Sequence, residues 1–129
     1  MQIIVFTLDD QYYSLDSSRV EEISRQIPST MVPNAPAGVE GLINLRGNVV
    51  PLMNLAKLLH RKEDQCYNNI VIVQKEDEKI GILVHEVKEV LKIDESQIEE
   101  VSAKAGTGIV GIIQLGDKLV NHIDLDRIL

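Results

Sequence analysis

Histidine and cysteine side chains are the first candidates for chemistry in this chain of 129 residues. His60, His85 and His122 share no metal-ligand spacing with one another or with Cys66. Outside such a pattern, a histidine is more often a solvated or hydrogen-bonded residue than a ligand. The sequence therefore predicts no metal site and no bound cofactor.

Other patterns that could support catalysis are incomplete. Gly106-Thr107-Gly108 lacks the Lys-Ser/Thr pair of a phosphate-binding loop, and Ser102 lacks the G-x-S-x-G context of a hydrolase nucleophile. The acidic run at 94–100 is typical of a solvated face rather than of an acid/base pair. We therefore predict that the chain is not an enzyme.

Arg46 could do a different kind of chemistry, the recognition of carboxylates. It precedes Gly47 in a short polar turn between two apolar runs. A guanidinium presented there can make bidentate contacts with a partner's carboxylate. The alternative is an exposed arginine that only improves solubility, and the spacing alone does not separate the two.

The segment that carries Arg46 occurs twice, at residues 41–59 and, without gaps, at residues 111–129. Each copy has an apolar run, a short polar turn, a second apolar run, Asn54 or Asp124 as a helix N-cap, and a short apolar-periodic end. This order predicts strand, turn, strand and a short helix. Residues 4–23 and 71–90 repeat more loosely.

The repeat sets the expected architecture. We predict a mainly β chain, in which units 3–59 and 70–129 form two similar small barrels about a pseudo-twofold axis. Strand exchange between the two units is left open. Ser18 and Glu21 fit a capping box, which predicts a short helix or tight bend at 19–23. Residues 86–93 fit a helix or a bent strand, and Asp94 with Gln97 resembles another cap.

Composition excludes several classes of partner. The net charge of −7 and a pI near 4.9 disfavour a phosphate backbone, and aromatic residues make up only 3% of the chain, so we expect no nucleic-acid binding. One cysteine permits no internal disulfide, which favours a reducing compartment. No apolar run is long enough for a membrane span, and the first residues do not resemble a signal peptide. We expect a cytoplasmic protein.

Residues 41–55 read GLINLRGNVVPLMNL and closely resemble the signature of CheW-like coupling domains. Blocks at 6–23, 32–36, 71–91 and 115–129 are similar to the same family, so the resemblance covers nearly the whole chain. It implies two intertwined, five-stranded, SH3-like barrels. It also implies an adaptor between the cytoplasmic tip helices of chemoreceptors and the regulatory domain of the chemotaxis histidine kinase (CheA). Carried over by position, the binding and signalling residues would be Val20, Glu22, Gly41, Arg46, Gly81 and Val90.

The chain departs from the family pattern in three places. His85 stands where the family usually has Asp, His122 stands where it usually has an apolar residue, and the segment 102–108 is short. An alternative function is a small-ligand sensor built on the same double barrel. Its sign would be a buried polar cluster around His85 or His122.

Overall fold

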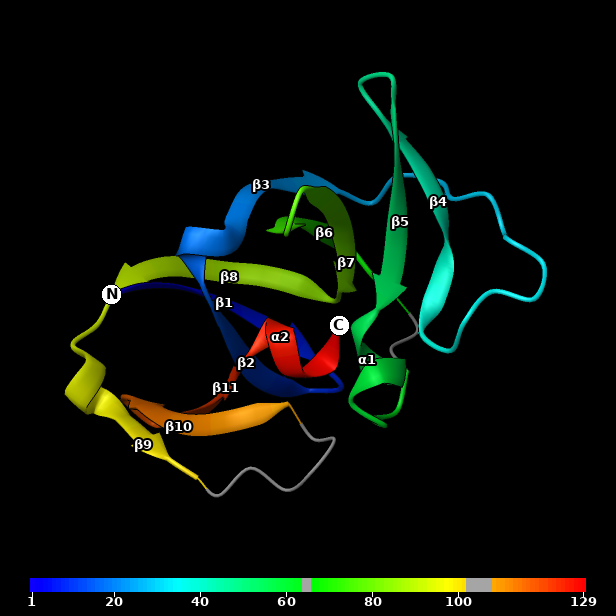
Figure 1. The fold of residues 1–129 in the computed structure, drawn as a ribbon. Coiled ribbons are helices and arrows are strands. Elements are labelled where there is room, and N and C mark those ends of the chain that lie inside the picture. The colour runs from blue at the N-terminus through cyan, green and yellow to red at the C-terminus, as the bar shows by residue number, and fades with distance from the viewer. Residues whose placement is uncertain (64–65, 102–107) are drawn as a thin grey trace.

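A computed structural model of the protein describes residues 1–63, 66–101 and 108–129 (Figure 1). In this part of the chain, eleven strands form two sheets, and the only helices are single turns. The prediction of a mainly β fold with a few short helices is confirmed.

We call the two sheets sheet A and sheet B. Sheet A contains β1 (Gln2–Leu8), β2 (Gln11–Asp16), β8 (Glu86–Lys92), β9 (Ile98–Glu100), β10 (Ile109–Leu115) and β11 (Lys118–Ile123). Sheet B contains β3 (Val20–Arg25), β4 (Val39–Leu45), β5 (Asn48–Asn54), β6 (Asn69–Lys75) and β7 (Glu78–Val84).

The two sheets exchange strands between the halves of the chain. Their strand orders are β8-β1-β2-β11-β10-β9 and β3-β6-β7-β5-β4. Each sheet therefore combines an N-terminal hairpin of one half, β1–β2 or β6–β7, with the later strands of the other half. This is the intertwined arrangement expected from the resemblance. Sheet A has one strand more than the expected five, because β9 pairs with β10.

In each sheet the two halves meet at two pairings, an antiparallel one (β1 with β8, or β3 with β6) and a short parallel one, which we call seam A or seam B. In seam A, β11 pairs with β2 (Val120↔Tyr12, Asn121↔Tyr13, His122↔Ser14). In seam B, β5 pairs with β7 (Leu52↔Gly81, Met53↔Ile82, Asn54↔Leu83). The remaining pairings are antiparallel, so the seams are the parallel part of each sheet.

The largest core lies between the sheets and draws on both halves. Phe6 and Leu15 from the first half pack with Val71 and Ile82 from the second, and Leu125 of the last helix closes the cluster. All five side chains are buried. Burying a side chain of this size contributes roughly 1.5–3 kcal/mol. The hydrophobic driving force therefore depends on both halves being present.

The repeated units have the predicted local structure. Hairpins β4–β5 and β10–β11 are followed by α1 (Leu55–Leu58) and α2 (Leu125–Ile128). The side chain of Asn54 accepts a hydrogen bond from Lys57 N at 3.2 Å, and Asp124 accepts one from Asp126 N at 3.0 Å. Both Asx residues thus act as the predicted N-caps.

One local prediction is wrong. Ser18 does not cap a helix at 19–23, because Asp16 accepts the hydrogen bond from Ser18 N at 2.9 Å and caps the single turn η1 (Ser17–Arg19). Residues 20–25 then form β3, which pairs with β6. Pairing with a distant strand has overridden a local helix signal.

The structure also decides the two other local patterns, residues 86–93 and the cap at Asp94. Residues 86–92 are strand, with an irregularity in the pairing of β8 with β1 between Val5 and Phe6. Asp94 and Gln97 form a capping box around the turn η2 (Glu95–Gln97), as predicted. No helix in the described residues is long and apolar enough to cross a membrane.

Candidate functional site

Arg46 lies at the tip of the β4–β5 hairpin. Its φ of +50° and the φ of +86° at Gly47 are both in the left-handed region, and Asn44 Oδ1 accepts a hydrogen bond from Gly47 N at 2.9 Å. This conformation costs an L-amino acid roughly 1–2 kcal/mol relative to the right-handed one. The repeat-related residue at the tip of β10–β11 is Gly116, with φ +62°. The chain therefore places an arginine where the fold would favour glycine.

Arg46 makes a bidentate ion pair with Glu22 of β3. Nη1 donates to Oε2 at 3.1 Å, and Nη2 donates to Oε1. Because β3 and β4 are the two outer strands of sheet B, this pair joins its opposite edges. A second link lies nearby, where Thr30 and Leu42 exchange backbone hydrogen bonds of 2.8 and 2.9 Å. These two links draw the outer edges of sheet B toward each other, as in a barrel.

The ion pair shifts the pKa of both side chains, and Arg46 stays in contact with solvent. The hydrogen bond from Arg46 lowers the pKa of Glu22, and Glu22 raises the pKa of Arg46. The Arg46 side chain remains 68% exposed. Exposed ion pairs are screened and contribute little to stability. A carboxylate on a partner protein could therefore exchange with Glu22 at low cost.

Apolar side chains are exposed near the hairpin tips in repeat-related pairs. Val49 on β5 and Leu119 on β11 are 68% and 62% exposed. Val49 lines a pocket of about 530 Å³ between the β4–β5 and β6–β7 hairpins, and Leu119 lines one of about 340 Å³ at the related place in sheet A. Ile23 on β3 and Val90 on β8 form a second exposed pair. Isolated exposed apolar residues are common, but two pairs related by the repeat form equivalent surfaces on the two sheets.

Two of the expected site residues are buried glycines in sheet B. A Cβ on Gly41 would lie 2.5 Å from the backbone oxygen of Thr30, so Gly41 allows residues near 30 to cross β4 closely. A Cβ on Gly81 would lie 3.1 Å from Ile70 and 3.3 Å from Leu52. Both glycines shape the packing of the sheet, and neither offers a side chain to a partner.

The structure brings only some of the six expected residues together. Arg46 and Glu22 are in direct contact. Gly41 and Gly81 belong to the same sheet, and half-buried Val20 packs from β3 against the central core. Val90, in contrast, lies on β8 in sheet A.

Sequence reasoning missed the exposed apolar residues Ile23, Val49 and Leu119. A usable signal was present for Val49 and Leu119, because each precedes a buried valine, so that apolar residues occupy both faces of the strand.

The two histidines that depart from the family pattern are both hydrogen-bonded. His85 Nδ1 lies 3.0 Å from Thr7 Oγ1. His122 is only 7% exposed, and its Nδ1 lies 2.8 Å from Ser14 Oγ across seam A. Burial lowers the pKa of His122, opposed by the charges of Asp16 and Asp124. This is the buried polar cluster that the alternative function requires.

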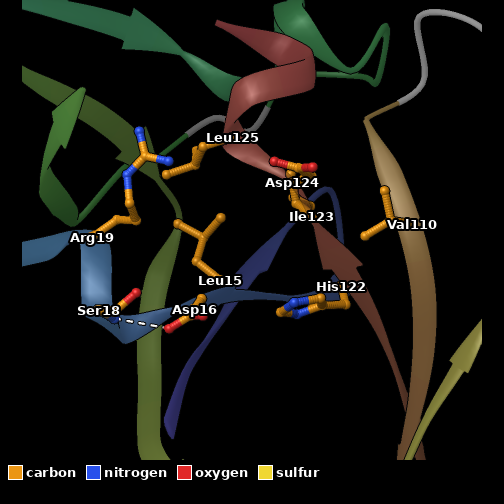
Figure 2. A pocket seen from close by; sticks show the side chains of 9 residues that line it. All are labelled: Leu15, Asp16, Ser18, Arg19, Val110, His122, Ile123, Asp124 and Leu125. Atoms are coloured by element: carbon orange, nitrogen blue, oxygen red, sulfur yellow. Dashed lines mark hydrogen bonds between the residues drawn. The ribbon is translucent and has the colours of Figure 1, made fainter. Parts of the chain in front are cut away.

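His122 lies beside a pocket of about 270 Å³ at the end of seam A (Figure 2). Among the described residues, no group of three or more His, Cys, Asp or Glu side chains could hold a metal ion. Ser102 and Thr107, considered above as catalytic candidates, lie outside the described part of the chain.

Comparisons with known proteins agree with this geometry. The family described as CheW-like domain matches residues 2–129. "Chemotaxis protein CheW" of Thermotoga maritima is 33% identical, with 99% of this chain and 87% of that protein covered. "Chemotaxis protein CheW" of Bacillus subtilis is 30% identical, with 99% and 86% covered. The crystal structure of scaffolding protein TtCheW from Thermoanaerobacter tengcongensis superposes with a TM-score of 0.86 at 33% identity, covering 96% of this chain and 84% of that one. The chain belongs to the CheW-like domain family.

Proposed function

We propose that the protein is a non-catalytic adaptor that couples chemoreceptors to the histidine kinase CheA in bacterial chemotaxis. The observation that carries the proposal is the ion pair of exposed Arg46 with Glu22 on the hairpin that also exposes Val49, in a fold shared with a scaffolding protein. An adaptor needs a rigid body with distinct surfaces and no reactive centre. The role places the protein in the cytoplasm, at receptor arrays, where it is held by its partners rather than by insertion into the membrane.

The end of sheet B is the surface we assign to the kinase regulatory domain. Arg46 presents a charged group in a fixed direction, because both backbone ends of the turn are held in the hairpin. Val49, three residues further along the same hairpin, adds exposed apolar area. Arginine is one of the residue types enriched among those that contribute most to interface affinity.

The receptor tip helix requires a different surface. An amphipathic helix binds by laying its apolar face against apolar side chains spaced along a groove. Val20 and Val90 supply such side chains from strands that the exchange places in different sheets, so a helix that contacts both would lie between the sheets. Gly41 and Gly81 then act indirectly, by holding the strands that shape these surfaces.

The test measures binding of the purified protein to a receptor tip peptide and to the kinase regulatory domain. Arg46→Glu reverses the charge at one hairpin tip, and Lys118→Glu reverses it at the repeat-related tip as a matched control. We expect Arg46→Glu to weaken kinase binding by about tenfold or more, while Lys118→Glu and the thermal midpoint change little. Failure of the unmodified protein to bind either partner would refute the adaptor role.

A further inference from the structure

The β4–β5 hairpin ends in a two-residue turn, because Leu45 pairs with Asn48 across Arg46 and Gly47. Both turn residues have positive φ, +50° at Arg46 and +86° at Gly47. This is the pattern of a type I′ turn, whose first position is normally taken by Asn, Asp or Gly. Arg46 therefore has a backbone conformation that its own residue type disfavours, and another part of the chain has to stabilise it.

Asn44 supplies this stabilisation from the last turn of strand before the tip. Its Oδ1 accepts a hydrogen bond from Gly47 N at 2.9 Å. A short side-chain amide that bonds a nearby backbone N–H is a common way of holding a turn. The bond joins the residues on either side of Leu45 and Arg46, so the backbone of Arg46 cannot rotate freely while the bond is made. Asn44 is exposed, and its side chain adds nothing to the apolar core.

The repeat-related tip is built differently. Its two turn residues are Gly116 and Asp117, between β10 and β11. Of these two, only Gly116 has positive φ, which is the pattern of a type II′ turn with glycine in its first position. Gln114 stands where the other copy has Asn44, and its side chain donates to Gly116 O at 3.4 Å. A hairpin of this fold therefore closes without an asparagine when the turn residue is not an arginine.

The conformation of the turn sets the direction of the Arg46 side chain. The Cα–Cβ bond of a residue follows its backbone dihedrals, and the Arg46 side chain is 68% exposed, so little packing holds it. Its guanidinium nevertheless makes the bidentate pair with Glu22 on the opposite edge of sheet B. Two parallel N–H···O bonds require a specific orientation of the planar group. A change of turn type would therefore be felt at the ion pair.

We propose that Asn44 is a positioning residue for Arg46: by holding the turn, it directs the guanidinium toward Glu22 in the free protein and toward a partner's carboxylate in the complex. The part that concerns the complex rests on the function proposed above, whereas the part that concerns Glu22 does not. In this role Asn44 acts through the turn and needs no contact with the partner.

The first measurement uses the free protein and follows the titration of the Glu22 carboxyl by its ¹³C chemical shift. The hydrogen bond from Arg46 lowers the pKa of Glu22, so the titration midpoint reports how well the guanidinium is placed. We expect the midpoint to rise in Asn44→Ala, and to rise less in Asn44→Ser, whose hydroxyl still offers an acceptor. Gln114→Ala is the matched control at the other tip and should leave the midpoint unchanged.

The second measurement separates positioning from a general loss of structure. In an Arg46→Gly background there is no guanidinium to position, so Asn44→Ala should change neither the Glu22 titration nor the affinity for the kinase regulatory domain any further. With Arg46 present, Asn44→Ala should weaken kinase binding by about two- to tenfold, the effect of one hydrogen bond.

The role of Asn44 is overturned if Asn44→Ala leaves the Glu22 midpoint unchanged, or if its effect is equally large in the Arg46→Gly background or in Gln114→Ala. Kinase affinity that falls in Arg46→Gly but not in Asn44→Ala would overturn the part that concerns the complex. If the unmodified protein does not bind the kinase domain, the proposed kinase contact fails, and the Glu22 titration still decides whether Asn44 positions Arg46.

Discussion

His122 occupies in sheet A the position that Leu52 occupies in sheet B. Both residues are buried on the strand that completes a parallel seam, but His122 contacts a serine side chain where Leu52 contacts a glycine. The same scaffold therefore contains one titratable seam and one apolar seam. Conditions that protonate an imidazole should affect the two seams unequally.

The stability of the protein should fall at mildly acidic pH through His122. Its pKa is lowered from the ordinary 6.5 in the folded state, so the unfolded chain binds the proton more tightly. The contribution is fully present above about pH 6.5 and is lost as the pH falls through the folded pKa. The charged groups that line the pockets on either side of the ring are Asp16, Arg19, Asp124, Glu100 and Arg127.

The measurement is urea unfolding of the unmodified protein and of His122→Leu between about pH 7.5 and 5. The difference in unfolding free energy between the two proteins should shift in favour of the variant as the pH is lowered. Other histidines titrate in both proteins and cancel in the difference. A difference that stays constant with pH would show that folding does not shift the pKa of His122.

Arg46→Gly should separate partner binding from stability. The substitution removes the exposed pair with Glu22 but relieves a left-handed backbone conformation, and these effects oppose each other. We expect the thermal midpoint to stay within about 5 °C of the unmodified protein. Kinase binding should fall, because the group presented at the hairpin tip is gone.

Arg46→Lys is the matched variant for the same site. It keeps the positive charge and loses the planar, bidentate geometry. Binding weakened by both variants would indicate that the geometry matters, whereas binding weakened only by Arg46→Gly would assign the effect to charge. If neither variant changes the affinity, the surface at the end of sheet B is not the kinase contact.

Local signals in the sequence predicted the repeated hairpin and helix well. The turns contain Gly next to polar residues, and Asn54 and Asp124 cap the helices, so each signal acts within a few residues. Residues 19–23 were predicted wrongly because the competing interaction is the pairing of β3 with β6. A pattern confined to one segment contains no information on a partner strand that is distant in sequence.

The candidate site shows the same limit. Arg46 was placed at a hairpin tip from its turn residues, and Glu22 was named only through the family resemblance. Their contact depends on the curvature of sheet B, which brings its two outer strands together. The pocket beside His122 likewise depends on strand exchange, because its lining residues Asp16 and Asp124 belong to different halves of the chain.

Gly41 and Gly111 are repeat-related and should respond differently to alanine. At Gly41 the new Cβ would lie 2.5 Å from a backbone oxygen of Thr30, which can move only with its segment. At Gly111 the nearest atom, also at 2.5 Å, is the Cγ2 of Ile98, which is part of a side chain. We expect Gly41→Ala to cost about 1–3 kcal/mol and Gly111→Ala to cost less. Urea unfolding of the two variants checks the order, and an equal or reversed order would contradict it.

The exchange of strands predicts that neither half of the chain folds alone. Residues 1–63 contain β1–β2 without β8 and β11, the strands that flank this hairpin in sheet A. Residues 66–129 contain β6–β7 without β3 and β5, which flank it in sheet B. Each fragment would expose paired-strand edges and the apolar residues of the shared core, and an isolated hairpin is marginally stable at best. Separately expressed fragments should show unfolded circular dichroism and NMR spectra, and mixing them should restore the spectrum of the whole protein. A fragment that folds cooperatively by itself would show that its half of the core is sufficient, and that the exchanged strands add to a stable unit rather than create it.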